Sequence, residues 1–220
     1  MPTIAKTERI ETASIPPLGL EGILGLPASA IGLVLFARGS GSSRHSPRNN
    51  QVAAALRRAA LATLLFDLLT EREADDRANV FDIALLASRL LMVTDWAKAL
   101  ESARALPIGY FGASTGAAAA LVAAAHPGNR ISAIVSRGGR PDLAGDALAR
   151  VTAPTLLIVG GSDTEVLALN RSAQRVLGGE SALRVVPHAT HLFEESGALE
   201  TVTDLAREWF LVHMPASARR

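Results

Sequence analysis

Short apolar runs alternate with longer segments of helical periodicity along most of the chain. Such short runs are typical of strands buried on both faces, and the periodic segments are typical of helices that cross between parallel strands. The alternation therefore predicts an α/β protein with a mostly parallel sheet. The predicted strands are residues 18–26, 30–37, 61–67, 108–111, 131–135, 155–159 and 183–186.

The predicted helices lie between and after these strands. They cover residues 46–58, 79–100, 114–125, 165–177 and 196–213, with a weaker helix after Asp142. The first begins with Ser46 as N-cap and Pro47 in the first turn. No repeat, linker or insertion of lid size interrupts the pattern. We therefore predict one domain over residues 1–220, with loosely ordered ends at 1–12 and 214–220.

The segment Gly112-Ala113-Ser114-Thr115-Gly116 matches the pattern G-x-S-x-G. It lies between a predicted strand and a predicted helix, which is the context of a nucleophile elbow, a sharp turn that exposes a reactive serine. Only small residues fit beside such a turn, and the two flanking glycines meet this need. The alternative is a Gly/Ser turn that only packs a helix closely against the sheet.

A serine hydroxyl is a poor nucleophile near neutral pH and needs a base to take its proton. In serine enzymes with this elbow, an acid and then a histidine follow the serine along the chain. Of the five histidines, His188 and His191 fall in the loop after the last predicted strand, where the base belongs. We select His191 because it lies just before the final helix. We expect His188, directly after Pro187, to lie at the surface or to support the site without taking part in the reaction.

The base in turn needs a carboxylate that fixes its tautomer and stabilises the imidazolium. Asp163 follows the strand 155–159 and two consecutive glycines that allow a sharp turn. Asp142, in the loop one strand earlier, is the competitor. The alternative role for Asp163 is to cap the helix that begins near Glu165. The predicted triad is Ser114, Asp163 and His191.

Acyl transfer also needs an oxyanion hole, which consists of backbone N–H groups aimed at the developing charge. Thr115, the residue after the serine, supplies one of them. The other is expected from the Gly/Ser-rich loop after strand 30–37, where the Ser40 amide is the first candidate and Gly39 the next. This loop does not fit a phosphate loop, because G-x-x-x-x-G-K-[ST] is absent and its G-x-G-x-x-G spacing ends in Arg44.

Composition and charge narrow the classes of function. The chain has 22 Lys and Arg against 21 Asp and Glu, a net charge of +1, so we expect no nucleic-acid partner. The absence of cysteine excludes disulfides, thiolate metal sites and a thiol nucleophile. These observations leave room for a hydroxyl nucleophile.

The mean hydropathy of +0.25 raises the question of a membrane segment. The longest uncharged stretch, residues 105–129, is long enough to cross a bilayer, but it contains several Pro, Gly and polar residues. A buried strand, a tight turn and a small-residue helix explain it better. The first twelve residues are charged and no apolar segment follows them, so no signal peptide is predicted. We expect a cytoplasmic protein without a membrane partner.

From about residue 18 to residue 209 the chain resembles small α/β-hydrolases of the dienelactone hydrolase-like family. The most specific segments are FARGSGSSRHSPRN at residues 36–49, GYFGASTG at 109–116, SRGGRPDL at 136–143 and HLFEE at 191–195. The resemblance implies a three-layer sandwich with an eight-stranded, mostly parallel sheet, and therefore one more strand near the N-terminus. It also implies hydrolysis of esters or lactones by a Ser or Cys nucleophile with Asp and His, without metal or cofactor.

The chain departs from this family at two positions. Members named for dienelactone use Cys where this chain has Ser114, which leaves hydrolase chemistry intact and puts the dienelactone substrate in doubt. Arg38 stands where such loops commonly carry His before the Gly. Because the oxyanion donors are backbone groups, Arg38 is compatible with activity and could add positive charge near the site.

Several arginines fall on loops at the carboxyl ends of predicted strands, where α/β sheets bind ligands. A guanidinium group there could recognise a substrate carboxylate or phosphate. The alternative is that these arginines pair with local acids such as Asp67, Glu71 and Asp142, or cap nearby helices. The candidates are Arg38, Arg44, Arg48, Arg137 and Arg140.

Together these features predict a serine hydrolase that acts on a small-molecule ester or lactone, as a monomer or homodimer. Two other functions fit the same residues. A catalytically inert binding protein would keep the fold and the pocket, and an acyltransferase would use the same triad with an alcohol or amine acceptor.

Overall fold

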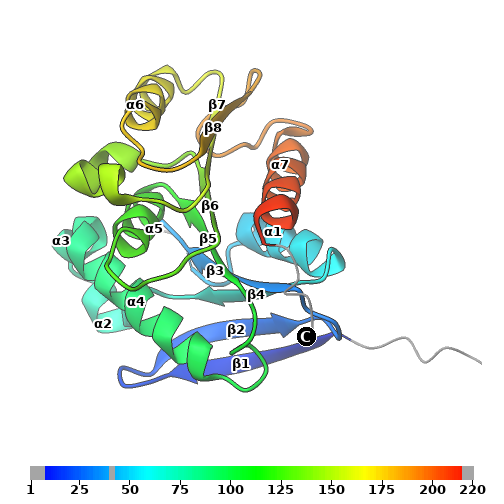
Figure 1. Ribbon diagram of the computed structural model, residues 1–220. Helices are drawn as coiled ribbons and strands as arrows, with labels where there is room; N and C mark the ends of the chain where they lie inside the picture. Colours follow the sequence, from blue (N-terminus) through cyan, green and yellow to red (C-terminus); the bar gives the residue numbers. More distant parts are fainter. Residues whose placement is uncertain (1–7, 40–42, 215–220) are drawn as a thin grey trace, which may run out of the picture.

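Eight strands form one sheet in the computed structural model, which describes residues 8–39 and 43–214. Their order across the sheet is β1-β2-β4-β3-β5-β6-β7-β8 (Figure 1). β2 pairs antiparallel with β1 and β4, and the other neighbouring pairs are parallel, which confirms the predicted sheet. The strands are β1 (Arg9–Ile15), β2 (Leu20–Leu26), β3 (Gly32–Ala37), β4 (Leu61–Phe66), β5 (Ile108–Ala113), β6 (Ala133–Arg137), β7 (Thr155–Gly160) and β8 (Ser181–Val186).

Helices cover both faces of the sheet and complete the three layers. α1 and α7 lie on one face, and the remaining helices lie on the other (Figure 1). Their bounds are α1 (Pro47–Arg58), α2 (Glu71–Ala74), α3 (Arg77–Phe81), α4 (Ile83–Ala99), α5 (Thr115–Ala124), the 3-10 helix η1 (Pro141–Arg150), α6 (Thr164–Gln174) and α7 (Ala198–His213). Among the helices of the described ranges, none is long and apolar enough to cross a membrane.

The additional strand expected near the N-terminus is β1. Its first half, residues 9–12, corrects the prediction that residues 1–12 are a loosely ordered end. β1 lies at the edge of the sheet and pairs only with β2, so that Arg9 is opposite Leu26 and Ile15 is opposite Leu20. Most of its side chains are exposed or half-buried, and for this reason the strand lacks the apolar run that marks the central strands.

The segment predicted as one helix over residues 79–100 is divided in the structure. Asp82 separates α3 from α4, and its carboxylate accepts the N–H of Leu85 at 2.9 Å. An aspartate in this position satisfies a free N–H group in the first turn of the following helix. The break therefore coincides with a residue that favours a helix start over a helix interior.

The central strands carry the core. Every residue of β3, β4, β5 and β7 is buried, as their apolar runs predicted. α5 is almost completely buried as well and consists largely of alanine. Small side chains let this helix pack close to the sheet.

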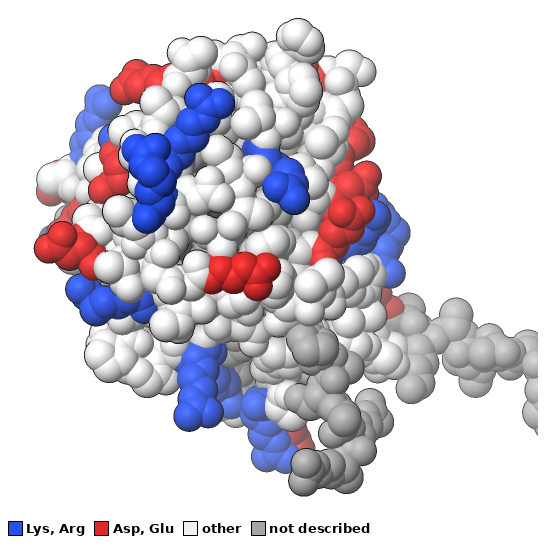
Figure 2. All heavy atoms as spheres, turned by 45° about the horizontal axis from the view of Figure 1, so that its top comes forward, with Lys and Arg blue, Asp and Glu red and all other residues white. Residues whose placement is uncertain are grey.

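Charged residues are distributed over the surface without a strong excess of either sign. Figure 2 shows basic and acidic side chains interspersed among uncharged residues on one face. This agrees with the nearly balanced composition.

Tyr110 in β5 holds its hydroxyl group inside the protein. The residue is fully buried, and its hydroxyl lies 2.7 Å from the Thr94 hydroxyl and accepts the side-chain N–H of Asn129 at 3.0 Å. Burial is the main cause that raises the pKa of Tyr110 to about 12.

Tyr110 is the only tyrosine in the chain, so the tyrosinate absorbance should report this burial directly. We expect the native protein to titrate near pH 12 and the denatured protein near pH 10. Since the native pKa is raised, the associated stability is present below pH 10 and is lost as the pH rises from 10 towards 12. A titration midpoint near pH 10 in the native protein would show that the Tyr110 hydroxyl is not buried as described.

Candidate active site

Ser114 occupies a strained turn between β5 and α5. Its φ of 50° and ψ of −124° lie outside the regions that side-chain-bearing residues prefer. Such a conformation costs about 1–3 kcal/mol and persists only where surrounding contacts hold it. The predicted strand–turn–helix context of the G-x-S-x-G segment is confirmed, with the helix beginning at Thr115.

Steric contacts explain why the residues beside this turn are glycines. A Cβ at Gly116 would lie 2.5 Å from the carbonyl oxygen of Arg38, and a Cβ at Gly112 would lie 2.5 Å from the Cα of Ala117. Both distances are below any real Cβ contact. The first turn of α5 therefore lies directly against the end of β3.

His191 and Asp163 form a hydrogen-bonded pair. His191 Nδ1 lies 2.7 Å from Asp163 Oδ2, and the side chains are 42% and 16% exposed. Asp163 is the N-cap residue of α6, yet its side chain makes no capping bond. Its carboxylate therefore binds the histidine and does not cap the helix, which was the alternative role considered from the sequence.

Hydrogen bonds between two loops bring this pair together. The N–H of Gly161 donates to the Val186 carbonyl at 2.8 Å, and the N–H of Ser162 donates to the Ala189 carbonyl at 2.9 Å. Gly160 is needed here, since its Cβ would lie 2.6 Å from the Thr190 carbonyl oxygen. The loop after β7 is therefore fastened to the loop that carries His191.

The loop after β6 lies beside both the serine and the histidine. The N–H of Arg140 donates to the Ser114 carbonyl at 3.1 Å. A Cβ at Gly138 would lie 3.5 Å from Cε1 of His191. Ser114 and His191 thus both contact this loop. In the described part of the structure their side chains do not form a hydrogen bond with each other. Such bonds are often long before substrate binds.

One of the predicted oxyanion donors lies in the described structure. Thr115 is buried in the first turn of α5, where backbone N–H groups have no helical partner. Gly39 is next to the serine, since its Cβ would lie 2.6 Å from the Cβ of Ser114. Ser40, the first candidate for the second donor, lies outside the described residues.

Arg38 and Arg44 both pair with Asp67 at the end of β4. A terminal nitrogen of Arg38 lies 2.6 Å from the Asp67 carboxylate, and one of Arg44 lies 2.5 Å from it. Arg44 also pairs with Glu21. Burial lowers the pKa of Arg38, and the Asp67 carboxylate opposes this shift. Pairing with local acids was the alternative to ligand binding in the sequence analysis. The two ion pairs hold the residues on either side of the Gly/Ser loop, Arg38 and Arg44, against Asp67.

Two further candidate arginines have acidic partners. Arg140 binds Asp142 with two nitrogens, at 2.9 and 2.7 Å, and this pairing raises the pKa of Arg140. Asp142, the competitor for the acid of the triad, is therefore engaged by an arginine. Arg48 lies 2.6 Å from Glu194. Arg137 differs from all of these and is buried at the end of β6.

Two supporting residues were missed by sequence reasoning. Asn170 is fully buried in α6 and donates to the Gly139 carbonyl at 2.9 Å, which steadies the loop after β6. Glu195 accepts the N–H of Thr190 at 3.0 Å, which closes the loop around His191. Asn170 could have been noticed, because it lies on the apolar face of its predicted helix together with Val166.

Comparison with solved structures identifies relatives with the same fold. A dienelactone hydrolase from Anabaena variabilis is 52% identical, with a TM-score of 0.89 over 96% of this chain and 99% of that chain. Est1E from Butyrivibrio proteoclasticus has a TM-score of 0.78 over 92% of this chain and 98% of that chain. At 19% identity, the second comparison shows the fold alone. No protein-family model matches the chain.

Two Mycobacterium tuberculosis proteins, each with a name that proposes a phosphoribosyl transferase, are 61% identical over 198 residues. The match covers 90% of this chain but 45% of each relative. The chain thus spans less than half the length of these curated relatives.

Proposed function

Because the chain belongs to the dienelactone hydrolase-like family of α/β-hydrolases, we propose that it is a serine hydrolase that cleaves a carboxylic ester or lactone. The pairing of Asp163 with His191 carries this proposal. An aspartate at the N-cap of a helix ordinarily accepts an N–H of the first turn. Here the carboxylate instead accepts a hydrogen bond from an imidazole on another loop, as a base for the serine requires.

The proposed reaction begins at the Ser114 hydroxyl. Its oxygen attacks the carbonyl carbon while Nε2 of His191 takes the proton. Asp163 accepts the Nδ1–H of His191, and this fixes the tautomer whose Nε2 is free to act as the base. The Thr115 N–H stabilises the oxyanion, and the amino end of α5 adds positive partial charge.

The second half of the reaction uses the same groups. His191 gives its proton to the departing alcohol, which leaves the acyl group on Ser114. His191 then takes a proton from a water molecule, whose oxygen attacks the acyl carbon. The bond between that carbon and the Ser114 oxygen breaks, His191 returns the proton to Ser114, and the acid is released. Ser114 is the protein group that becomes covalently bonded to the substrate in this scheme, and His191 only transfers protons.

The name of the M. tuberculosis relatives suggests a different activity. We propose that their shared segment is a hydrolase unit and that a transferase activity belongs to the part outside the match, which is more than half of each protein. An acyltransferase with the same triad is the other alternative. It would form a product that depends on an added alcohol or amine, whereas a hydrolase would not.

Labelling with a fluorophosphonate probe tests whether Ser114 is activated. We expect the native protein to form an adduct at Ser114, because a fluorophosphonate reacts with a serine whose proton is taken by a neighbouring base. Ser114→Ala should give no adduct, and His191→Ala should react far more slowly.

A native protein without a serine adduct would support the inert binding protein and would contradict the hydrolase. A panel of short-chain aryl esters and lactones would then define the substrate class of a labelled protein.

A further inference from the structure

Arg137 is buried at the end of β6, and the described part of the chain places no acidic partner beside it. It is 9% exposed, and its Nε and Nη1 atoms are enclosed and form no hydrogen bond with any residue of 8–39 or 43–214. Within the described ranges, no Asp or Glu forms an ion pair with it, and the segments outside those ranges contain neither residue type. Buried arginines normally have such a partner, because an unpaired buried charge is strongly unfavourable.

The charged neighbour of Arg137 makes this environment more positive. Burial, and then the like charge of Arg48, lower the pKa of Arg137 to about 10. Arg137 therefore remains a cation at neutral pH. Arg38, Arg44 and Arg140 each bind a carboxylate, and Arg48 itself pairs with Glu194 at 2.6 Å. Among the candidate arginines, Arg137 alone has no acidic partner within the described ranges.

The strand register places Arg137 beside the proposed catalytic residues. It lies opposite Ala113, which directly precedes Ser114 in the chain. The next residue, Gly138, contacts His191. Side chains alternate along a strand, so Arg137 points to the same face as Val135, which packs in the layer of α1 and α7.

The amino end of α1 contributes to the same positive region. Arg48 is in its first turn, Ser46 makes no side-chain cap, and no acidic residue is present in that turn. The N–H groups of Arg48 and Asn49 have no partner within the helix. A helix end of this kind carries positive partial charge and favours an anion.

We propose that Arg137 and the amino end of α1 bind a phosphate group, either free or carried by the substrate. The unpaired guanidinium group of Arg137 and the amino end of α1 can bind several oxygens of a doubly charged oxyanion, whereas Arg48 beside them is already paired with Glu194. The case in which the substrate carries the phosphate rests on the proposed hydrolase function. It makes the substrate class a phosphorylated ester or lactone, held by its phosphate while Ser114 attacks the carbonyl.

Thermal unfolding with inorganic phosphate tests the site without any need for activity. Phosphate should raise the Tm of the native protein, because a ligand that binds the folded state stabilises it. Acetate at equal ionic strength should raise it far less. No phosphate shift, or an equal shift with acetate, would contradict the proposal.

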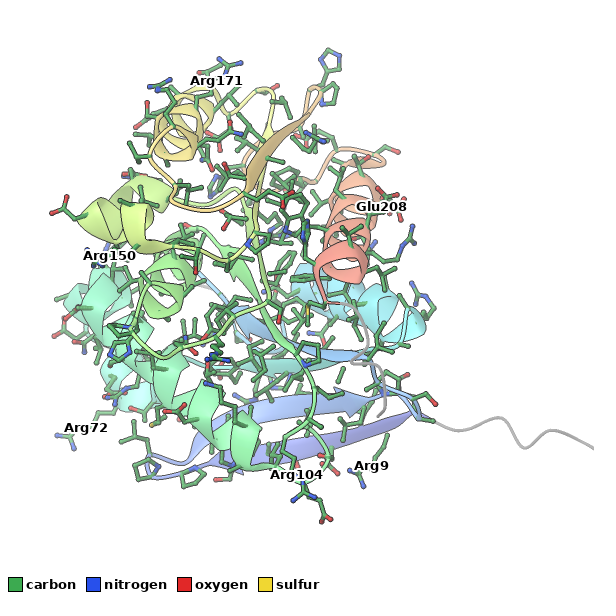
Figure 3. All side chains as sticks on the ribbon, viewed as in Figure 1. Arg9, Arg72, Arg104, Arg150, Arg171 and Glu208 are labelled. Atoms are coloured by element: carbon green, nitrogen blue, oxygen red, sulfur yellow. The ribbon has the colours of Figure 1, made fainter. Side chains whose placement is uncertain are left out.

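Arg137→Met removes the charge and keeps a side chain of similar length. We expect this variant to keep or gain Tm in the absence of phosphate, because the unpaired charge is gone, and to lose the phosphate response. The control is Arg171→Met, since Arg171 lies exposed on α6 and projects outward (Figure 3). Its phosphate response should equal that of the native protein. An equal response in Arg137→Met, or a large loss of Tm without phosphate, would show a purely structural arginine and contradict the proposal.

Arg137→Lys keeps the charge but loses the planar fork of the guanidinium group. We expect it to bind phosphate about tenfold more weakly, which corresponds to a loss of about one well-formed hydrogen bond. If Arg137→Met does not fold, an unchanged affinity in Arg137→Lys would contradict the proposal.

Kinetics separate the two sources of the phosphate. With a phosphorylated substrate, Arg137→Met should lower the ratio of kcat/KM for a phosphorylated over a neutral aryl ester by about tenfold or more. If this ratio is unchanged but the rise in Tm with phosphate still depends on Arg137, the site binds free phosphate. A rise in Tm with phosphate, in a protein that fluorophosphonate does not label, would support the phosphate site and contradict the hydrolase. Labelling without a rise in Tm would support the hydrolase and contradict the phosphate site.

Discussion

Replacement of Ser114 by alanine is expected to lower kcat for ester hydrolysis by about 10⁴-fold or more. The substitution removes the oxygen that attacks the carbonyl, so His191 has no serine proton to take and Asp163 orients an idle base. The backbone donor at Thr115 remains, and it leaves the small residual rate that such sites show. Steady-state hydrolysis of an aryl ester measures the loss, and circular dichroism checks that the fold is retained.

The matched control is Ser88→Ala on α4. Ser88 is exposed and its hydroxyl donates to the Leu85 carbonyl of the same helix at 2.7 Å. This variant should keep the native kcat. A Ser114→Ala protein that retains more than about a tenth of the native kcat would rule out Ser114 as the nucleophile.

Asp163→Asn should lower kcat by a similar factor, about 10⁴-fold, while the loop geometry is preserved. An amide in this position can donate to Nδ1 of His191, and it then favours the tautomer in which Nε2 carries the hydrogen. That tautomer cannot accept the proton of Ser114. The loss should appear in kcat at neutral pH, and a pH–rate profile would show the changed base.

Asp142→Asn is the control for this carboxylate. Asp142 is an aspartate on the preceding loop, but it binds Arg140 and not the histidine. We expect a small effect on kcat from this variant. A larger loss in Asp142→Asn than in Asp163→Asn would reverse the assignment of the acid.

The central part of the fold could be predicted from the sequence because its signals are local. The apolar runs of β3, β5 and β7 are buried as predicted, and α1 begins at Pro47 after Ser46 as its helix-start residues indicated. The turn at Ser114 is also local, because the serine and both small residues beside it are contiguous.

The prediction was wrong or incomplete where a strand or helix depends on its neighbours. β1 owes its conformation to pairing with β2, and its own residues carry little hydrophobic signal. The break at Asp82 was missed because the apolar periodicity continues through it, although the capping preference of aspartate was visible.

For the candidate site, the sequence offered residue types and possible acidic partners for the arginines, but it did not decide between ligand binding and ion pairing. Sequence order and position after a strand narrowed the acid and the base to two candidates each. The glycines before Asp163 and the position of His191 before the last helix then selected the proposed triad. Arg44 pairs with Asp67, 23 positions away, only because β3 and β4 are neighbours in the sheet. Likewise, the lack of an acidic partner for Arg137 within the described ranges depends on the tertiary structure and leaves no local signal in the sequence.

The close contact between Gly116 and the end of β3 has a consequence for local opening of the protein. The serine turn is held between the two central strands and the loop after β6, so it cannot open unless the middle of the sheet separates. Its amide hydrogens should therefore exchange with solvent only through global unfolding, whereas α2, a four-residue helix without buried residues, should exchange readily. Heat or denaturant should consequently not produce a folded but inactive form: activity and tertiary structure should disappear in one transition.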